Sequence, residues 1–302
     1  MELQKKVRLK ANESFNFREG WLRKGMRCVG EDPRLFSRSD AMITLGIGSK
    51  MVKSLKFWLQ ATHLCQEHKG TRENPSRTLE ITDDFGAIIE QYDPYFDDSF
   101  TLCLLHYHLV KNWKFAMVWH LFFNEFTATS FTKENMVTMC TEILNKKMET
   151  GAEFSEKSFA SDCSSVLAMY LADLEENDDP EDNLKCPLAQ LGLLQRNPKP
   201  AQGYHRTPPQ LEDLSPQALL YVMVSNLAPD RNSVSFDSLL NAPNQIGKLF
   251  HLDRILLNEY LDQLRVQNYV SLQRTANLNM VNLRHELTPE KIMRDYYENQ
   301  AG

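Results

Sequence analysis

The sequence predicts a mainly α-helical protein that carries small β-hairpins. Apolar residues recur at three- and four-residue spacing over most of its 302 residues, as they do on the buried side of a helix. Near each end of the chain, short stretches of strand-like composition flank a polar turn, which is typical of a hairpin. Between them lies a long apolar region whose segments begin with helix-capping residues. We therefore expect hairpin-bearing helical modules on either side of a helical middle.

The composition limits the class of protein. Hydrophobic residues make up 42% of the chain and charged residues 25%, which is ordinary for a globular protein with a buried core. Six cysteines occur without a C-x-x-C spacing, so neither a disulfide framework nor a structural zinc site is expected. Residues 1–10 are polar and basic, and no stretch approaches the roughly 18 uninterrupted apolar residues of a membrane span. These features predict a soluble cytoplasmic protein with no membrane partner.

Charge is distributed unevenly along the chain. Residues 1–80 carry a net charge of +7, whereas residues 81–302 carry a net charge of −13. A basic lobe joined to an acidic body indicates that only the first lobe faces a polyanion. Random asymmetry is the alternative, but a contrast of this size between two segments favours a functional cause.

The basic lobe has the pattern of a helix-turn-helix. Helical spacing runs over residues 17–29, and a shorter helix is expected around residues 41–45. A Gly-Ile-Gly turn at residues 46–48 leads into a helix over residues 49–63. Three lysines fall at i, i+3 and i+6 on this last helix, so we expect their ammonium groups on one exposed strip. They are Lys50, Lys53 and Lys56.

A basic hairpin is expected after the lysine-bearing helix. Strands are predicted at residues 62–67 and 78–81, with a polar basic loop between them. A helix that enters the major groove and a hairpin that grips the DNA backbone form the winged-helix pattern. Such folds also dock proteins, but the basic residues favour nucleic acid. The residues expected to contact double-stranded DNA are Arg18, Lys24, Ser49, Lys50, Lys53, Lys56, Lys69, Arg72 and Arg77.

Composition also predicts the domain boundaries. We expect an N-terminal winged-helix domain at residues 1–92, a helical middle domain at 93–196 and a C-terminal winged-helix-like domain at 215–302. The proline-rich residues 197–214 predict an extended linker. The C-terminal domain repeats the order of helices followed by a hairpin, but its long helix at 253–267 mixes acidic with basic residues. A structural or protein-docking role is favoured there, with DNA contact second.

The residues best suited to hydrolysis lie in the middle domain. The chain has no phosphate-binding loop, dinucleotide fingerprint or recognisable hydrolase motif. Carboxylates and imidazoles can nevertheless hold a divalent metal against a phosphodiester and activate a water. The candidate catalytic residues are Asp97, Asp98, His106, His108 and Glu125. Two alternatives stay open, because the aspartates suit a helix N-terminus and the two neighbouring histidines suit buried, hydrogen-bonded positions about 200° apart on one helix.

Five segments of the chain resemble one bacterial family, and they occur in order along the sequence. They are residues 14–25, 45–54, 101–109, 123–126 and 186–192. On these segments the sequence is similar to the SspB-type DNA nickase family of single-strand DNA phosphorothioation (Ssp) defence systems. That family was first described as one of unknown function beside phosphorothioation genes.

The resemblance implies a specific role. A member of this family would nick one DNA strand and thereby expose a site where partner proteins replace a non-bridging phosphate oxygen by sulfur. The implied partners are a cysteine desulfurase, an ATPase and a sulfurtransferase that resembles phosphoadenosine-phosphosulfate (PAPS) reductase. Mg²⁺ is the cofactor expected of such a nickase, and no catalytic residue is carried over from the family.

We therefore expect a DNA-binding and DNA-nicking component of a phosphorothioate modification and anti-phage defence system. The alternative is a non-catalytic winged-helix adaptor or transcriptional regulator that binds DNA and recruits the modification machinery. The lack of a recognisable nuclease motif in the sequence favours this alternative.

Overall fold

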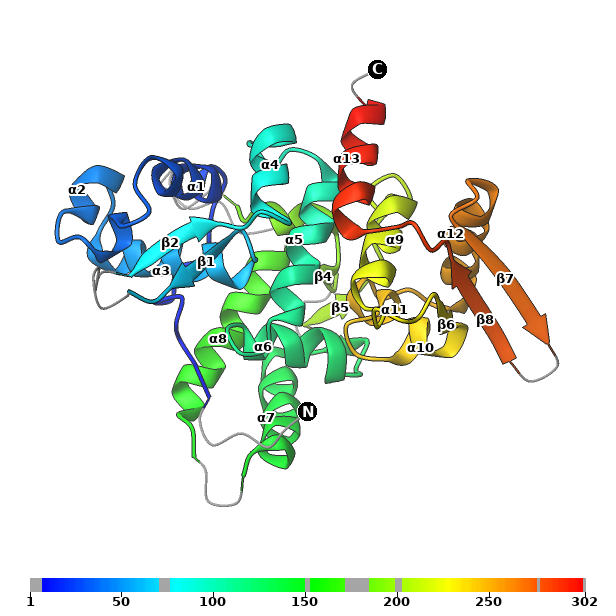
Figure 1. The fold of residues 1–302 in the computed structure, drawn as a ribbon. Coiled ribbons are helices and arrows are strands. Elements are labelled where there is room, and N and C mark those ends of the chain that lie inside the picture. Colours follow the sequence, from blue (N-terminus) through cyan, green and yellow to red (C-terminus); the bar gives the residue numbers. More distant parts are fainter. Residues whose placement is uncertain are drawn as a thin grey trace.

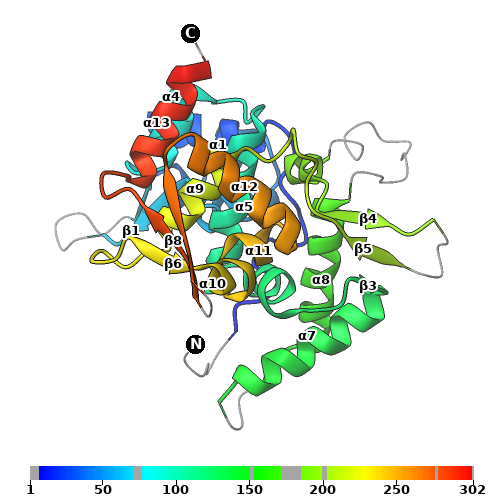
Figure 2. The same ribbon diagram turned by 90° about the vertical axis from the view of Figure 1, so that its right-hand side faces the viewer.

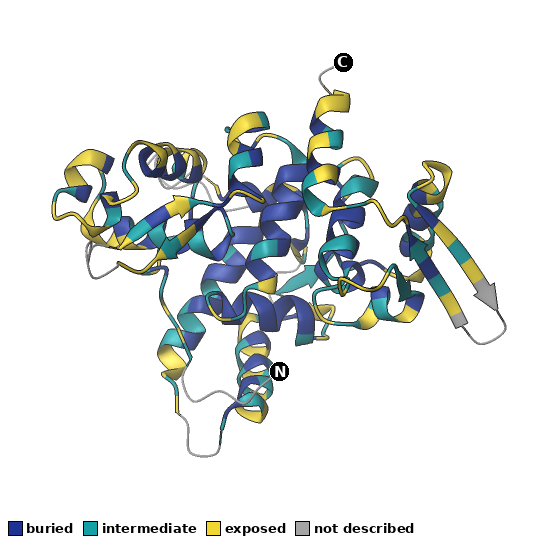
Figure 3. Ribbon diagram, viewed as in Figure 1, coloured by how far each residue is buried: buried dark blue, intermediate teal, exposed yellow. Residues whose placement is uncertain are grey.

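The computed structural model describes residues 7–70, 77–149, 153–171, 185–198, 203–275 and 278–300. Helices dominate these residues, and the strands form three small antiparallel sheets (Figure 1). The expected mainly helical class is confirmed. One hydrophobic core joins side chains from every part of the described chain, and burial is deepest along the central helix α5 (Ser99–Lys111) (Figure 3).

An N-terminal unit, residues 7–81, contains helices and a hairpin in the expected order. Its elements are α1 (Trp21–Glu31), the 3-10 turn η1 (Leu35–Ser37), α2 (Ala41–Leu45), α3 (Ser49–Ala61), β1 (Cys65–His68) and β2 (Thr78–Ile81). Gly46 ends α2 at a φ of 61°, a left-handed conformation that glycine adopts without strain. The two strands pair with Cys65 opposite Ile81.

The middle of the chain packs around α5. This helix is buried along nearly its whole length because apolar residues occupy all of its faces. The other elements are α4 (Gly86–Tyr92), α6 (Met117–His120), a π-helical turn η2 (Leu121–Glu125), β3 (Ser130–Phe131), α7 (Lys133–Lys147), α8 (Glu156–Tyr170), the 3-10 helix η3 (Pro187–Leu191), β4 (Leu194–Arg196) and β5 (Tyr204–Arg206). Strand β5 lies between β3 and β4 in a three-stranded sheet.

The segment expected to be an extended linker differs from that expectation where it is described. Strand β5 falls inside residues 197–214 and pairs on both of its edges. The Arg206 guanidinium donates a hydrogen bond of 2.6 Å to the carbonyl of Phe126, and Leu214 is fully buried. Prolines are compatible with this packing because they flank the short strand and do not lie inside it.

A C-terminal unit, residues 215–300, completes the fold (Figure 2). Its elements are α9 (Pro216–Ser225), β6 (Ser233–Ser235), α10 (Phe236–Asn241), α11 (Ile246–Leu249), α12 (Arg254–Val266), β7 (Val270–Thr275), β8 (Leu278–Leu283) and α13 (Pro289–Gln300). Strand β8 lies between β6 and β7. Helix α13, which the sequence reasoning missed, packs against α9 and also reaches α4, where Tyr297 stacks on Tyr92 at 5.2 Å between ring centroids.

The six cysteines are free thiols in this structure and all are buried. Burial raises the pKa of Cys65 and Cys140 to about 12, so these thiols stay protonated at neutral pH. Among the described residues, no helix has the length and apolar character needed to cross a bilayer.

Candidate functional site

Most of the expected DNA-contact residues lie at the surface of the N-terminal unit. Ser49 and Lys50 are exposed at the start of α3. The Lys53 side chain is 70% exposed, and its Nζ lies 3.9 Å from the Glu13 carboxylate. The Lys24 Nζ lies 3.9 Å from the position that a Cβ atom on Gly46 would occupy, so this side chain of α1 reaches the turn before α3. Lys69 and Arg77 are exposed in the hairpin region, Arg18 is half-buried, and Arg72 lies outside the described residues.

Lys56 does not extend the exposed strip of Lys50 and Lys53. Its side chain is only 25% exposed, and its Nζ lies 2.5 Å from the Glu67 carboxylate, which also pairs with Arg77 at 3.3 Å. Partial burial opposes ionisation of Glu67, but the hydrogen bond and charge of Lys56 lower its pKa below the ordinary value. Strand β1 brings Glu67 back onto α3, so Lys56 ties the hairpin to this helix.

His106, a candidate catalytic residue, is enclosed in the core. Its Nε2 donates to the Leu249 carbonyl at 2.9 Å, and its Nδ1 accepts from the Tyr170 hydroxyl at 2.8 Å. Burial lowers the pKa of His106 to about 4 despite the hydrogen bond to Leu249, so the ring is neutral at physiological pH. Both ring nitrogens are occupied, and this residue joins α5 to α8 and α11.

The candidate carboxylates lie elsewhere and have structural partners. Asp98 caps α5 by accepting from the Phe100 amide at 2.8 Å, and it also accepts from the Tyr296 hydroxyl at 3.0 Å. Asp97 is exposed beside it, and the pair lies about 12 Å along the helix from His106. Glu125 pairs with Lys147 of α7 at 2.7 Å. The structure therefore does not bring the five candidate catalytic residues together.

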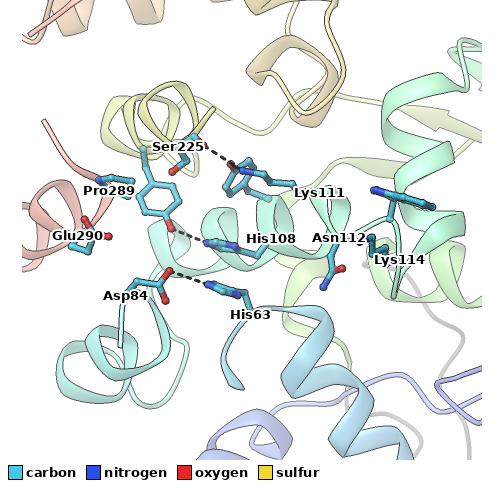
Figure 4. A pocket seen from close by; sticks show the side chains of 12 residues that line it. His63, Asp84, His108, Lys111, Asn112, Lys114, Ser225, Pro289 and Glu290 are labelled. Atoms are coloured by element: carbon cyan, nitrogen blue, oxygen red, sulfur yellow. Dashed lines mark hydrogen bonds and ion pairs between the residues drawn. The ribbon is translucent and has the colours of Figure 1, made fainter. Parts of the chain in front are cut away.

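The remaining candidate, His108, faces a different set of partners in a pocket of about 500 Å³ (Figure 4). The pocket lies where the N-terminal unit, α5, α9 and the start of α13 meet. Its lining residues are His63, Asp84, Tyr107, His108, Lys111, Asn112, Trp113, Lys114, Tyr221, Ser225, Pro289 and Glu290.

His63 and Asp84 form a pair in this pocket. His63 follows the end of α3 at a φ of 63°, which is uncommon for a residue other than glycine. Thr82 holds this turn, because its Oγ1 donates to the His63 carbonyl at 2.8 Å. The His63 Nε2 lies 3.1 Å from the Asp84 carboxylate, so the carboxylate orients the imidazole (Figure 4).

His108 stacks beneath this pair and is itself hydrogen-bonded. The His63 and His108 rings lie 4.9 Å apart at an angle of 18°. The His108 Nε2 lies 2.7 Å from the Tyr221 hydroxyl. Burial lowers the pKa of His108 and raises that of Tyr221. Tyr221 therefore keeps its proton and donates a hydrogen bond to a neutral His108.

Two lysines give the pocket positive charge. Lys111 donates to the Tyr107 hydroxyl at 2.6 Å and to the Ser225 carbonyl at 3.3 Å, and Lys114 is exposed nearby (Figure 4). Neither ammonium group lies within ion-pair distance of a carboxylate in the described part of the chain. An oriented imidazole beside unpaired ammonium groups can move a proton and stabilise negative charge on a phosphate.

Comparison with known proteins places the chain in a family. A family described as a protein of unknown function (DUF4007) matches residues 10–297. The chain belongs to this family. No curated protein matches the sequence.

Solved structures show which fold the DUF4007 chain has. One, described as an SspB crystal structure, is 23% identical, with a TM-score of 0.81 over 97% of this chain and 87% of that one. Another, described as a magnesium ion-bound SspB crystal structure, is 24% identical with the same TM-score and coverage. The expected resemblance to SspB-type proteins is thus confirmed at the level of the fold.

One of these neighbours is described as magnesium ion-bound, and a comparable site in this chain would need several donor side chains grouped together. Among the described residues, no three His, Cys, Asp or Glu side chains are grouped as metal ligands would be. The expected donors Asp98 and Glu125 are engaged by Tyr296 and Lys147, and both nitrogens of His106 are occupied. The five residues proposed from the sequence are therefore not grouped as ligands of one Mg²⁺ ion.

Of the residues that line the pocket, the sequence singled out only His108, and it missed His63, Asp84, Tyr221, Lys111 and Lys114 among others. His63 was expected to be the last residue of a helix. The one local signal was the adjacency of Asp84 to the predicted strand at 78–81, which leads the chain back towards the end of α3. Tyr221 gave no local signal, because it occupies an ordinary apolar position on α9.

Proposed function

We propose that this protein binds double-stranded DNA and nicks one strand, as a component of a phosphorothioation-based anti-phage system. The SspB-like fold supports the link to phosphorothioation. The observation that carries the proposed activity is the His63–Asp84 pair beside unpaired lysines, in a pocket that adjoins the end of α3.

DNA binding is assigned to the N-terminal unit. Its order of three helices and a hairpin matches that of a winged-helix domain, in which the N-terminal residues of the last helix contact base edges. Ser49, Lys50 and Lys53 occupy that part of α3 and are exposed. Phosphate contacts from such lysines supply sequence-independent affinity that falls as salt rises.

Strand cleavage is assigned to the pocket. The His63 imidazole, oriented by Asp84, would take a proton from the attacking water as that water attacks phosphorus. The phosphorus–oxygen ester bond then breaks, and the leaving oxygen takes a proton from solvent. Lys111 and Lys114 would stabilise the negative charge that develops on the phosphate oxygens, because they have no described carboxylate partner.

A supercoiled-plasmid assay with Mg²⁺ present tests this proposal. Wild-type protein should produce open-circle DNA, and His63→Ala should slow nicking by at least about 100-fold, as expected for loss of a proton-transfer group. The control is His285→Ala, which removes an exposed histidine outside the pocket. Equal nicking by both variants would contradict the assignment of His63.

A DNA-binding adaptor is the second candidate function. It is favoured by the scattered positions of the five catalytic residues proposed from the sequence, because His106, Asp98 and Glu125 already have structural partners. The test uses wild-type protein free of other nucleases. If it is retained on duplex DNA but yields no open-circle product, the adaptor function is supported and the nicking function is contradicted.

A further inference from the structure

We propose that the His63 pocket is a binding site for a nucleoside monophosphate, presented either as a free nucleotide or as the terminal nucleotide of a DNA strand. The inference deepens the proposed function and rests on it in one respect, because a nick creates strand termini that such a site would hold. The binding chemistry itself is argued from the side chains of the pocket.

The charges that face the pocket favour a phosphate. Lys111 and Lys114 contribute two ammonium groups that no described carboxylate neutralises. Asp84 is already paired with His63, which leaves Glu290 as the other carboxylate on the lining. Glu290 lies across the pocket from the two lysines, on the side of Asp84 (Figure 4). One end of the pocket is thus cationic, and a phosphate would occupy that end.

Another part of the lining suits a nucleobase. The volume of about 500 Å³ lies within the range of small-molecule pockets, roughly 300–1,000 Å³. Trp113 is half-buried and supplies aromatic surface on which a base can stack, whereas Tyr107 and Tyr221 are buried in the pocket wall.

The position of the pocket separates it from the duplex-binding surface. Helix α3 has 13 residues and is therefore about 20 Å long. Lys50 lies at its first turn and His63 just beyond its last. At about 3.4 Å per nucleotide along one strand, this distance corresponds to about six nucleotides. A strand end can therefore reach the pocket while Lys50 and Lys53 stay on the duplex.

Titration calorimetry on the full chain tests the site with deoxyadenosine 5′-monophosphate as the probe and deoxyadenosine as the phosphate-free control. We expect the nucleotide to bind at least about tenfold more tightly than the nucleoside, as a charge-assisted contact to phosphate implies. Lys114→Ala, at an exposed position that does not threaten folding, should weaken nucleotide binding about tenfold. Lys133→Ala on α7 is the matched control and should leave it unchanged.

A second pair of probes identifies the source of the phosphate. A single-stranded oligonucleotide with a 5′-phosphate is compared with the same oligonucleotide ending in a 5′-hydroxyl. A phosphate-dependent gain that Lys114→Ala removes assigns the site to strand ends, whereas a gain restricted to the mononucleotide assigns it to free nucleotides.

Two results would overturn the proposal. They are equal binding of nucleotide and nucleoside, and nucleotide binding that Lys114→Ala leaves intact. Failure of the proposed function gives a different result. If the protein neither nicks nor retains duplex DNA but still binds the nucleotide, the proposed function is wrong and the nucleotide site stands.

Discussion

The N-terminal and C-terminal units arrange similar elements but present different surfaces. In each, a long helix is followed by a hairpin, α3 before β1–β2 and α12 before β7–β8. The second position of α3 is the exposed Lys50, whereas the second position of α12 is Ile255, which is 68% exposed. Because backbone order is shared and surface chemistry is not, fold alone does not decide whether such a unit meets DNA.

The hairpins also differ in how they are held. In the N-terminal unit a partly buried cluster, Lys56, Glu67 and Arg77, joins the two-stranded hairpin to α3. In the C-terminal unit a third strand, β6, pairs with β8 and gives the sheet its own support. A two-stranded ribbon is marginally stable in water, so the first hairpin depends more on side-chain contacts than the second.

The largest effect should come from reversing charge on the two long helices. Lys50→Glu with Lys53→Glu should weaken retention on duplex DNA by about 100-fold or more and lower the slope of log affinity against log salt by about two. Arg254→Glu with Arg265→Glu makes the same charge change on α12 and should alter affinity by less than about threefold. Fluorescence anisotropy over a salt series measures both. Equal losses would mean that both units contact DNA.

Glycines near each unit allow a comparison of backbone packing. A Cβ at Gly86 would lie 2.2 Å from the Leu64 carbonyl oxygen, and one at Gly247 would lie 2.3 Å from that of Leu240. Alanine at Gly86 should lower the free energy of unfolding by about 4 kcal/mol, and Gly247 should behave alike. Gly48→Ala is the control, because nothing lies within 4 Å there, and it should cost less than about 1 kcal/mol. Urea denaturation reports all three.

His106 gives a pH test of how the C-terminal unit is attached through Leu249. Its folded pKa of about 4 lies below the unfolded value of about 6.5, so the unfolded chain takes up the proton first. Stability is therefore lost as pH falls from about 6.5 to about 4. Over this window the free energy of unfolding of the wild type should fall by about 3 kcal/mol more than that of His106→Gln. Parallel curves would mean that His106 takes up its proton at the same pH in the folded and the unfolded protein.

The smallest effect concerns the ion pairs of the two units. A double-mutant cycle on Lys56 and Glu67 should give a coupling of about 1 kcal/mol, whereas the exposed Asp262–Arg265 pair of α12 should give less than about 0.5 kcal/mol. The lowered pKa of Glu67 also predicts the direction in which the stability contributed by this pair changes with pH. Its contribution is present above the unfolded carboxyl pKa and is lost as pH falls through the lower folded pKa. Equal couplings would remove the distinction between the hairpins.

Much of the N-terminal unit could be predicted because its information is local. Spacing of apolar residues located α1 and α3, and a glycine turn located the end of α2. The C-terminal helices α9 and α12 and the strands β7 and β8 followed from the same kind of pattern. Strand β5 inside residues 197–214 was not predicted, since a three-residue strand is too short to give a period.

The sequence by itself determined the helical class, the order of the main helices and the concentration of positive charge at the start of the chain, because these depend on neighbours a few residues apart. Only the tertiary structure decided which ionisable groups meet. It paired Lys56 with Glu67, enclosed His106 in the core and assembled His63, Asp84, His108 and Tyr221 from four separate parts of the chain. Contacts between residues 11 to 143 positions apart depend on how whole elements pack, and local periodicity carries no record of that packing.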